Sequence, residues 1–344
     1  MPPASTAKLF TAAALLSVHK ATDRIRTTVR AGTGGAVVLV GGGDPTLTAA
    51  PAGRPGRYPQ AARMSDLAAT LRRANVRPTR IVVANGVFRG PSVSPAWAAE
   101  DIPSSYAAPV TALLADGGRD TPGASARSTA PDLAAGHALA VALGRPNLSI
   151  ARGPVGAGQV LAGVSSAALG TLVAQMLQGS DNVIAECLAR QVALAEGQPA
   201  SFTGATAAVR AVLRRILHLD PGAGLLDGSG LAASDRVSAA ALVAVLRAAS
   251  RTPRLGDIVS GLPVAGWSGT LAARYLAAAT HAAAGLVRAK TGTLTGVSAL
   301  AGVLHDRSGG LLVFAVVADR APSTPQAEGA LDVLASRLAG CGCS

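Results

Sequence analysis

The first residues that could carry chemistry are Ser5 and Lys8, at the start of an apolar helical stretch. Residues three positions apart share one face of a helix, so the Lys8 amine can lie beside the Ser5 hydroxyl. Ser5 falls in the first helical turn, where its backbone N–H is free to bind an oxyanion. A Ser-x-x-Lys pair alone occurs by chance in many helices, so further residues must support a catalytic interpretation.

Two later motifs supply the hydroxyl, amide and cationic groups that such a serine needs. Ser180, Asp181 and Asn182 lie at the junction of two expected helices, and Lys290-Thr291-Gly292-Thr293 lies on an expected strand. The three motifs appear in the order Ser-x-x-Lys, Ser-Asp-Asn, Lys-Thr-Gly. That order is the pattern of the active-site-serine penicillin-binding proteins and β-lactamases.

Four flanking stretches indicate which family of these active-site-serine enzymes the sequence resembles. The sequence resembles the D-alanyl-D-alanine carboxypeptidases/endopeptidases of the low-molecular-mass class C penicillin-binding proteins, the S13 peptidases, over essentially the whole chain. Ordinary β-lactamases lack the long insert that follows the first motif in this family. The matching stretches are GGGDPTLT (41–48), AWAAEDIPSSYAAPVTAL (96–113), LLDGSGLAASDRVS (225–238) and LPVAGWSGTLAARY (262–275).

The resemblance implies a serine mechanism. Ser5 would attack the carbonyl of the penultimate D-alanine of a peptidoglycan stem peptide, and water would hydrolyse the acyl-enzyme. Lys8 would be the base, its pKa lowered by partial desolvation and by a second cation. Ser180 would relay the proton to the leaving amine, and Asn182 would bind a substrate amide and orient Lys8. β-Lactams would acylate the same serine.

The resemblance also implies substrate contacts. Lys290 and Thr291 would face the terminal carboxylate, and Gly292 would let the substrate lie along the strand. The backbone N–H groups of Ser5 and Thr293 would form the oxyanion hole. Two residues of the insert match positions that recognise the side chain of the stem peptide's third residue: Asp101 and Tyr106.

Hydrophobic periodicity predicts the elements that position these residues. An α+β fold is expected, interrupted by an inserted β-rich domain of residues 23–155. The resemblance implies that residues 1–22 and 156–344 form a transpeptidase-like domain. By resemblance, the N-terminal strands of the transpeptidase sheet are missing ahead of Ser5. Predicted helices are 5–20, 64–76, 165–179, 182–197, 203–219, 236–250 and 324–340; predicted strands are two within 27–42 and 79–88, 286–293, 297–304 and 310–319.

Composition excludes several other classes of protein. The net charge of +12 comes chiefly from dispersed arginines, with no dense basic run interleaved with aromatic residues, which argues against a nucleic-acid partner. No apolar run has the roughly 18 residues of a membrane span. The five histidines form no cluster, so neither a metal nor a cofactor is expected. No signal peptide is visible, although the resemblance implies a location in the cell envelope.

Two alternatives remain open from the sequence. A β-lactamase or esterase could use the same serine, and a truncated, inactive relative could bind peptidoglycan without cleaving it. Asp181, Asp227 and Ser229 are each expected to shape a turn or loop rather than to act as catalysts.

Overall fold

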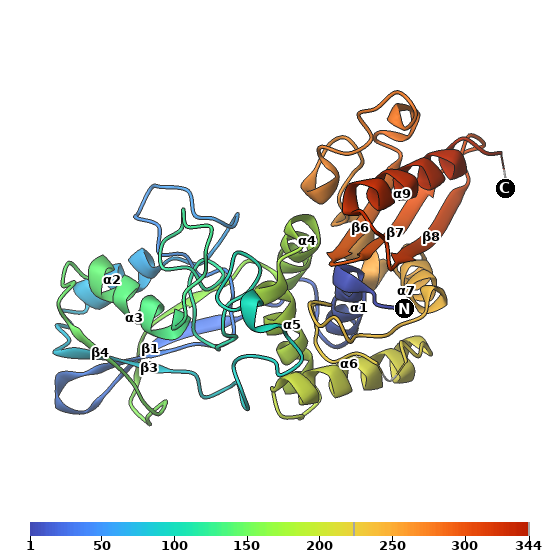
Figure 1. The fold of residues 1–344 in the computed structure, drawn as a ribbon. Coiled ribbons are helices and arrows are strands. Elements are labelled where there is room, and N and C mark those ends of the chain that lie inside the picture. The colour runs from blue at the N-terminus through green and yellow to red at the C-terminus, as the bar shows by residue number, and fades with distance from the viewer. Residues whose placement is uncertain (223, 343–344) are drawn as a thin grey trace. The chain divides into compact units, whose positions relative to one another are not determined.

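The computed structural model describes residues 1–222 and 224–342, and the chain divides into two compact units (Figure 1). The first unit consists of Met1–Ala21, Gly170–Gln198 and the described residues from Phe202 onward. The second unit consists of Thr22–Leu169 and Pro199–Ser201.

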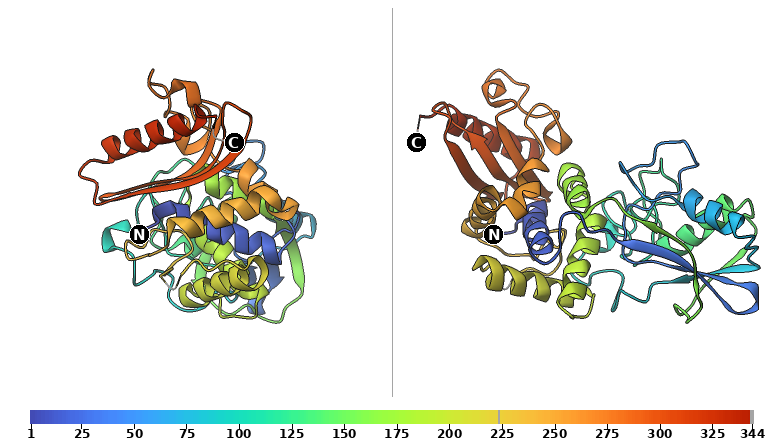
Figure 2. Two further views of the ribbon diagram at one scale, coloured as in Figure 1. Left: turned by 90° about the vertical axis from the view of Figure 1, so that its right-hand side faces the viewer. Right: turned by 180° about the vertical axis from the view of Figure 1, so that it is seen from behind.

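A three-stranded antiparallel sheet is the framework of the first unit. Strands β6 (Val287–Leu294), β7 (Val297–His305) and β8 (Leu311–Asp319) follow one another in the order β6-β7-β8. Helix α9 (Thr324–Ala339) lies on one face of this sheet, while α1 and α7 lie on the other (Figure 2). Leucine, alanine and phenylalanine side chains fill the space beneath α9, among them Leu300, Leu304, Phe314, Leu331 and Ala335.

A buried helix stands at the centre of the other elements of the first unit. Helix α1 (Lys8–Val18) is preceded by the 3₁₀ turn η1 (Ala4–Ala7), and every residue from Lys8 to Ser17 is buried. It packs against α5, α6 and α7, which explains why it is apolar on all sides. The remaining helices and turns of this unit are α4 (Leu169–Gly179), α5 (Asn182–Ala195), α6 (Phe202–Leu217), α7 (Ala239–Arg251), η4 (Pro253–Leu255), α8 (Gly256–Ser260), η5 (Gly269–Leu271) and η6 (His281–Ala283).

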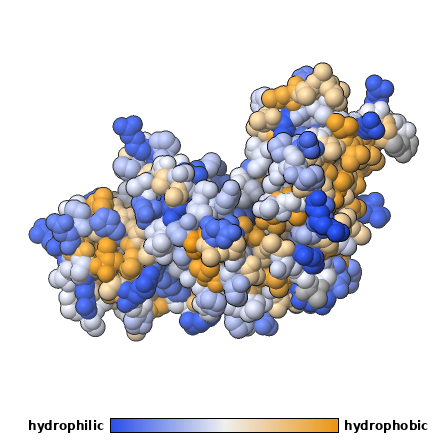
Figure 3. Space-filling model, viewed as in Figure 1, coloured by the Kyte–Doolittle hydropathy of each residue, from blue (hydrophilic) through white to orange (hydrophobic). Residues whose placement is uncertain are grey.

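Strand β8 forms the outer edge of the three-stranded sheet among the described residues. Its side chains are mostly half-buried, and Leu311 at its start is 46% exposed. Apolar surface therefore follows this strand in the space-filling view (Figure 3). Within residues 1–222 and 224–342, no helix combines the length and the apolarity needed to cross a bilayer.

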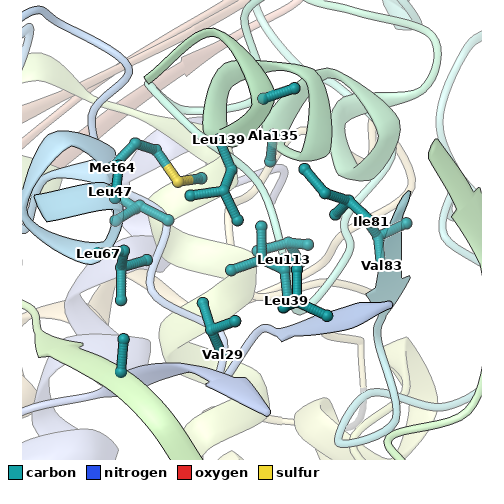
Figure 4. Packing of buried hydrophobic residues seen from close by; sticks show 14 of the residues in the cluster. Val29, Leu39, Leu47, Met64, Leu67, Ile81, Val83, Leu113, Ala135 and Leu139 are labelled. Atoms are coloured by element: carbon teal, nitrogen blue, oxygen red, sulfur yellow. The ribbon is translucent and has the colours of Figure 1, made fainter. Parts of the chain in front are cut away.

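The second unit contains a five-stranded mixed sheet of order β4-β3-β2-β1-β5. Strand β1 pairs antiparallel with β2 and β5, whereas β2–β3 and β3–β4 are parallel pairs. Valine, leucine and isoleucine side chains from the sheet meet those of α2 and α3 in one core (Figure 4). The elements are β1 (Arg26–Ala31), η2 (Thr33–Gly35), β2 (Val37–Val40), α2 (Met64–Arg73), β3 (Arg80–Ala84), η3 (Ala99–Asp101), α3 (Pro131–Ala142), β4 (Ser149–Arg152) and β5 (Val160–Ser165).

The α+β class predicted from the sequence is confirmed, and the predicted helices and strands occur with small changes at their ends. The division of the chain differs from the predicted one at its second boundary. Residues 156–169 were expected in the transpeptidase-like domain, but β5 pairs with β1 and so belongs to the second unit. The first unit therefore resumes at Gly170.

Candidate active site

Ser5 and Lys8 lie together where η1 passes into α1. The Lys8 Nζ donates hydrogen bonds to the Ser5 Oγ at 2.8 Å, to the Asn182 Oδ1 at 2.6 Å and to the Ser229 carbonyl oxygen at 2.7 Å. Lys8 is 0% exposed. A buried ammonium group is costly unless it is hydrogen-bonded, and here three oxygen atoms accept hydrogen bonds from it.

The junction of α4 and α5 supplies the second group of residues. Ser180 has a left-handed backbone with φ of +53°, and Asp181 caps α5 by accepting from the backbone N–H groups of Val183 at 2.9 Å and Ile184 at 3.2 Å. The structural role predicted for Asp181 is therefore confirmed. This cap fixes the start of α5 and places Asn182 in its first turn, within reach of Lys8.

Lys290 on β6 is the second buried cation of the site. Its Nζ donates to the Ser180 Oγ at 2.9 Å and to the Thr291 carbonyl oxygen at 2.7 Å, and the side chain is 0% exposed. Burial, followed by the positive charge of Lys8, lowers the pKa of Lys290 well below its usual value. The two lysines therefore oppose each other's protonation.

The outer edge of β6 is paired in its first half by the segment 263–265. The Ala289 N–H donates to the Pro263 carbonyl at 2.9 Å, and the Ala265 N–H donates to the Val287 carbonyl at 2.9 Å. Successive residues of a strand direct their backbone groups to alternate edges. Residues 291 and 293 therefore direct their N–H and C=O groups to this same edge, next to Lys290.

The glycine of the Lys-Thr-Gly motif lies against η1. A Cβ atom at Gly292 would lie 2.8 Å from the Pro3 carbonyl oxygen and 3.0 Å from the Ala4 Cβ. Only a glycine thus allows β6 to approach the turn that carries Ser5. Gly292 therefore has a structural role in addition to the room for substrate that the family resemblance implies.

The site contains two groups that were not predicted from the sequence. One is the Ser229 carbonyl, which carries no residue-type signal because every residue has one; only the Asp-Gly-Ser-Gly stretch marked the loop. The other is Thr270, whose Oγ1 lies 2.8 Å from the Thr291 Oγ1 in a hydrogen bond. Thr270 lies in the stretch 262–275 that carries part of the family resemblance.

Asp101 and Tyr106 both belong to the second unit. Asp101 ends η3, and burial together with the neighbouring Glu100 raises the pKa of its carboxyl group. Tyr106 is 64% exposed, and its backbone N–H donates to the Ser104 Oγ at 3.0 Å. Their role in substrate recognition remains a prediction.

Comparison with known proteins identifies the family of the chain. The model of the D-Ala-D-Ala carboxypeptidase 3 (S13) family matches residues 1–146 and 120–338. The chain belongs to this family. The S13 chain is 46% identical to a carboxypeptidase of Mycobacterium tuberculosis, over 99% of this chain and 76% of that protein. It is also 46% identical to carboxypeptidase DacB of Mycolicibacterium smegmatis, over 100% of this chain and 76% of that protein.

A solved structure has the same fold as the S13 chain. Penicillin binding protein 4 of Haemophilus influenzae superimposes with a TM-score of 0.80, covering 99% of this chain and 92% of that one at 22% identity. The predicted family, fold and enzyme class are thus confirmed: the chain is a D-Ala-D-Ala carboxypeptidase of the S13 family.

Proposed function

We propose that the S13 chain hydrolyses the terminal D-Ala–D-Ala bond of peptidoglycan stem peptides, with Ser5 as the nucleophile and Lys8 as its base. The observation that supports these roles is the 2.8 Å contact between the Lys8 Nζ and the Ser5 Oγ. A base this close can accept the hydroxyl proton as the oxygen attacks the carbonyl carbon.

The other two partners of Lys8 determine the direction of its lone pair. The Asn182 Oδ1 and the Ser229 carbonyl oxygen only accept hydrogen bonds. When Lys8 is neutral, its two N–H groups therefore face these two oxygens. Its lone pair then faces the Ser5 Oγ, which is the orientation that proton transfer requires.

Lys290 controls the proton balance of the site. Without substrate its pKa is lowered, so the pair of lysines disfavours two positive charges. A substrate carboxylate beside Lys290 and Thr291 would stabilise the ammonium form of Lys290. The charge of Lys290 would in turn favour the neutral form of Lys8, so that substrate binding itself prepares the base.

The free part of the β6 edge would hold the substrate. An extended peptide can add as a strand where residues 291 and 293 direct their backbone groups outward. The Thr293 N–H would then face the substrate carbonyl oxygen together with the Ser5 N–H, and the two would stabilise the tetrahedral oxyanion.

The reaction ends with two proton transfers. Ser180, which accepts from Lys290, would pass the proton taken from Ser5 to the amine of the leaving D-alanine. In the second transfer, neutral Lys8 would accept a proton from water as the water attacks the acyl carbon, and the Ser5 Oγ would take that proton when the ester bond breaks and the shortened peptide leaves. A β-lactam would form the same ester with Ser5 and remain attached.

The second unit would recognise the rest of the stem peptide. Asp101 and Tyr106 would contact the side chain of the third residue, and cleavage of cross-links would be a related endopeptidase activity. Because peptidoglycan lies outside the cytoplasmic membrane, we place the enzyme in the cell envelope.

A labelling experiment tests the role of Ser5. The chain is incubated with fluorescent penicillin, and D-alanine release from an acylated Lys-D-Ala-D-Ala tripeptide is measured in parallel. Ser17→Ala is the matched control, because this buried hydroxyl on α1 donates to the Ala13 carbonyl of its own helix at 2.7 Å.

We expect the wild type and Ser17→Ala to be labelled and to release D-alanine, and Ser5→Ala to do neither. Equal labelling of Ser5→Ala and the wild type would overturn the assignment. Rapid turnover of nitrocefin without stable labelling would instead favour the β-lactamase alternative.

A further inference from the structure

A short loop, Asp227–Ala232, lies beneath the catalytic lysine. Its Ser229 carbonyl oxygen accepts from the Lys8 Nζ at 2.7 Å, although Ser229 is 221 positions away along the chain. Its Gly230, at φ of +77°, lies so close to η1 that a Cβ there would overlap the Ala4 carbonyl oxygen. The loop therefore contacts both the base and the turn that carries the nucleophile.

One carboxylate determines the shape of this loop. Asp227 is 1% exposed, and its Oδ1 accepts from the backbone N–H groups of Ser229 at 2.9 Å and Gly230 at 2.5 Å. Its Oδ2 accepts from the Ala232 N–H at 2.8 Å. These bonds fix the peptide group that contains the Ser229 carbonyl and the peptide group before it, and so they fix the direction in which that carbonyl points.

The peptide before Ser229 is held by the two helices that carry the catalytic residues. The Gly228 N–H donates to the Glu186 carboxyl group on α5 at 3.0 Å and 3.1 Å, and the Gly228 carbonyl accepts from the Thr11 Oγ1 on α1 at 2.7 Å. Gly228 must be small, since a Cβ there would lie 2.6 Å from the Ala189 Cβ. The loop is thus hydrogen-bonded to α1 and α5, which carry Lys8 and Asn182.

We infer that Asp227 and Glu186 are positioning residues for Lys8, because they hold the Ser229 carbonyl where it takes one N–H of the amine and leaves the lone pair facing Ser5. Neither side chain needs to touch the substrate for this. The inference rests on the proposed role of Lys8 as the base.

This positioning role predicts a kinetic effect beyond a loss of stability. Asp227→Asn keeps the size of the side chain but replaces one acceptor oxygen by an NH₂ donor. The asparagine side chain therefore cannot accept hydrogen bonds from all three backbone N–H groups. The Ser229 carbonyl then moves, and a displacement of about 1 Å near a reacting group costs on the order of 10²-fold in rate. A carbonyl acceptor also favours the protonated amine, so its loss lets Lys8 lose its proton at lower pH.

Glu186 offers a matched pair of variants. Burial, followed by the charge of Asp227, raises the pKa of Glu186 to about 8, so at neutral pH the group is a neutral carboxylic acid. Glu186→Gln is then a close mimic that still accepts from Gly228, whereas Glu186→Leu is apolar and cannot. Thr11→Val is a milder third variant that removes only the bond to the Gly228 carbonyl.

The experiment measures the second-order rate constant of acylation by penicillin between pH 5 and 10, alongside thermal unfolding. Asp116→Asn is the control, because Asp116 is also fully buried and accepts from a backbone N–H, that of Ala49 at 2.9 Å, but in the second unit. We expect Asp227→Asn and Glu186→Leu to be acylated roughly 10- to 100-fold more slowly, with the rising limb of the pH profile moved to lower pH. Glu186→Gln and Asp116→Asn should keep the wild-type rate at pH 7.

The inference is overturned if Asp227→Asn is less stable but its folded fraction is acylated at the wild-type rate with an unchanged pH profile. If Asp227→Asn does not fold, the acylation rates of Glu186→Leu and Glu186→Gln are compared instead. If Glu186→Leu does not fold either, the acylation rate of Thr11→Val is compared with that of the wild type. Equal rates in the compared variants would overturn the inference. A wild type that is not acylated at all would refute the proposed function instead.

Discussion

Replacing Gly292 by alanine tests whether the approach of β6 to η1 holds Ser5 in place. The added Cβ would lie 2.8 Å from the Pro3 carbonyl oxygen, 3.0 Å from the Ala4 Cβ and 3.2 Å from the Ala299 Cβ. These separations are several tenths of an ångström shorter than ordinary contacts. Strand β6 is paired with β7 along its full length, so η1 is the part that must move.

The size of the effect follows from that movement. Overpacking of this kind costs about 1–3 kcal/mol in stability. Displacement of Ser5 from Lys8 and from the Thr293 N–H by a few tenths of an ångström to 1 Å should slow acylation by about 10- to 100-fold. Both effects have one cause, so the loss of stability and the loss of rate should appear together.

The assay combines stopped-flow acylation by a chromogenic penicillin with denaturant unfolding of the same samples. Gly329→Ala is the control, because Gly329 lies within α9 and a Cβ there meets nothing within 4 Å. Alanine in a helix interior should raise stability by about 0.5–1 kcal/mol and leave acylation unchanged. The two substitutions therefore have opposite expected signs.

Two results would refute the reasoning on Gly292. If Gly292→Ala were as stable as the wild type and acylated at the same rate, η1 would not depend on this glycine. If only turnover of the peptide fell, while stability and acylation by penicillin stayed normal, the glycine would instead provide room for an extended substrate.

Further predictions concern single carboxylates. Burial, followed by the charge of Asp227, raises the pKa of Asp235 to about 9 in the folded chain. The folded state therefore binds the proton more tightly than the unfolded state does. The resulting contribution to stability is complete below about pH 4 and is lost as the pH rises to 9. Asp235→Asn cannot ionise, so its advantage in unfolding free energy over the wild type should grow by up to ~1.4 kcal/mol per pH unit across that window; urea unfolding at pH 5, 7 and 9 measures this, and a constant difference would contradict it. Asp181→Ala removes the cap of α5 and should cost about 1 kcal/mol in thermal unfolding, whereas Asp181→Ser should keep most of the stability; equal losses in both variants would argue against the cap.

The sequence predicts those parts of the fold that depend on local pattern. The apolar period of residues 8–18 predicts α1, and the alternation and turn residues of 287–319 predict the hairpins of the three-stranded sheet. Strand pairing over long separations is different. The segment 160–165 has the same residues whichever sheet it joins, so its pairing with β1, more than a hundred positions earlier, cannot be read from them.

The candidate site likewise contains some residues that the sequence can locate and others that only the folded structure brings together. Lys8 is the one charged residue in a buried, mostly apolar helix, and Lys290 is a fully buried lysine on a strand of the three-stranded sheet. A charge inside an apolar helix is costly unless a function requires it, so the helix pattern locates Lys8, whereas Lys290 follows the exposed Arg288 at the two-residue spacing of a strand and is located by its Lys-Thr-Gly motif. The sequence cannot identify the oxygen atoms that accept hydrogen bonds from the buried lysines. The Asn182 and Ser229 oxygens lie 174 and 221 positions from Lys8 in the chain, and the second is a backbone atom. Only the packing of α1, α5 and the loop 227–232 brings them to the amine, which is the basis on which we infer a positioning role for Asp227.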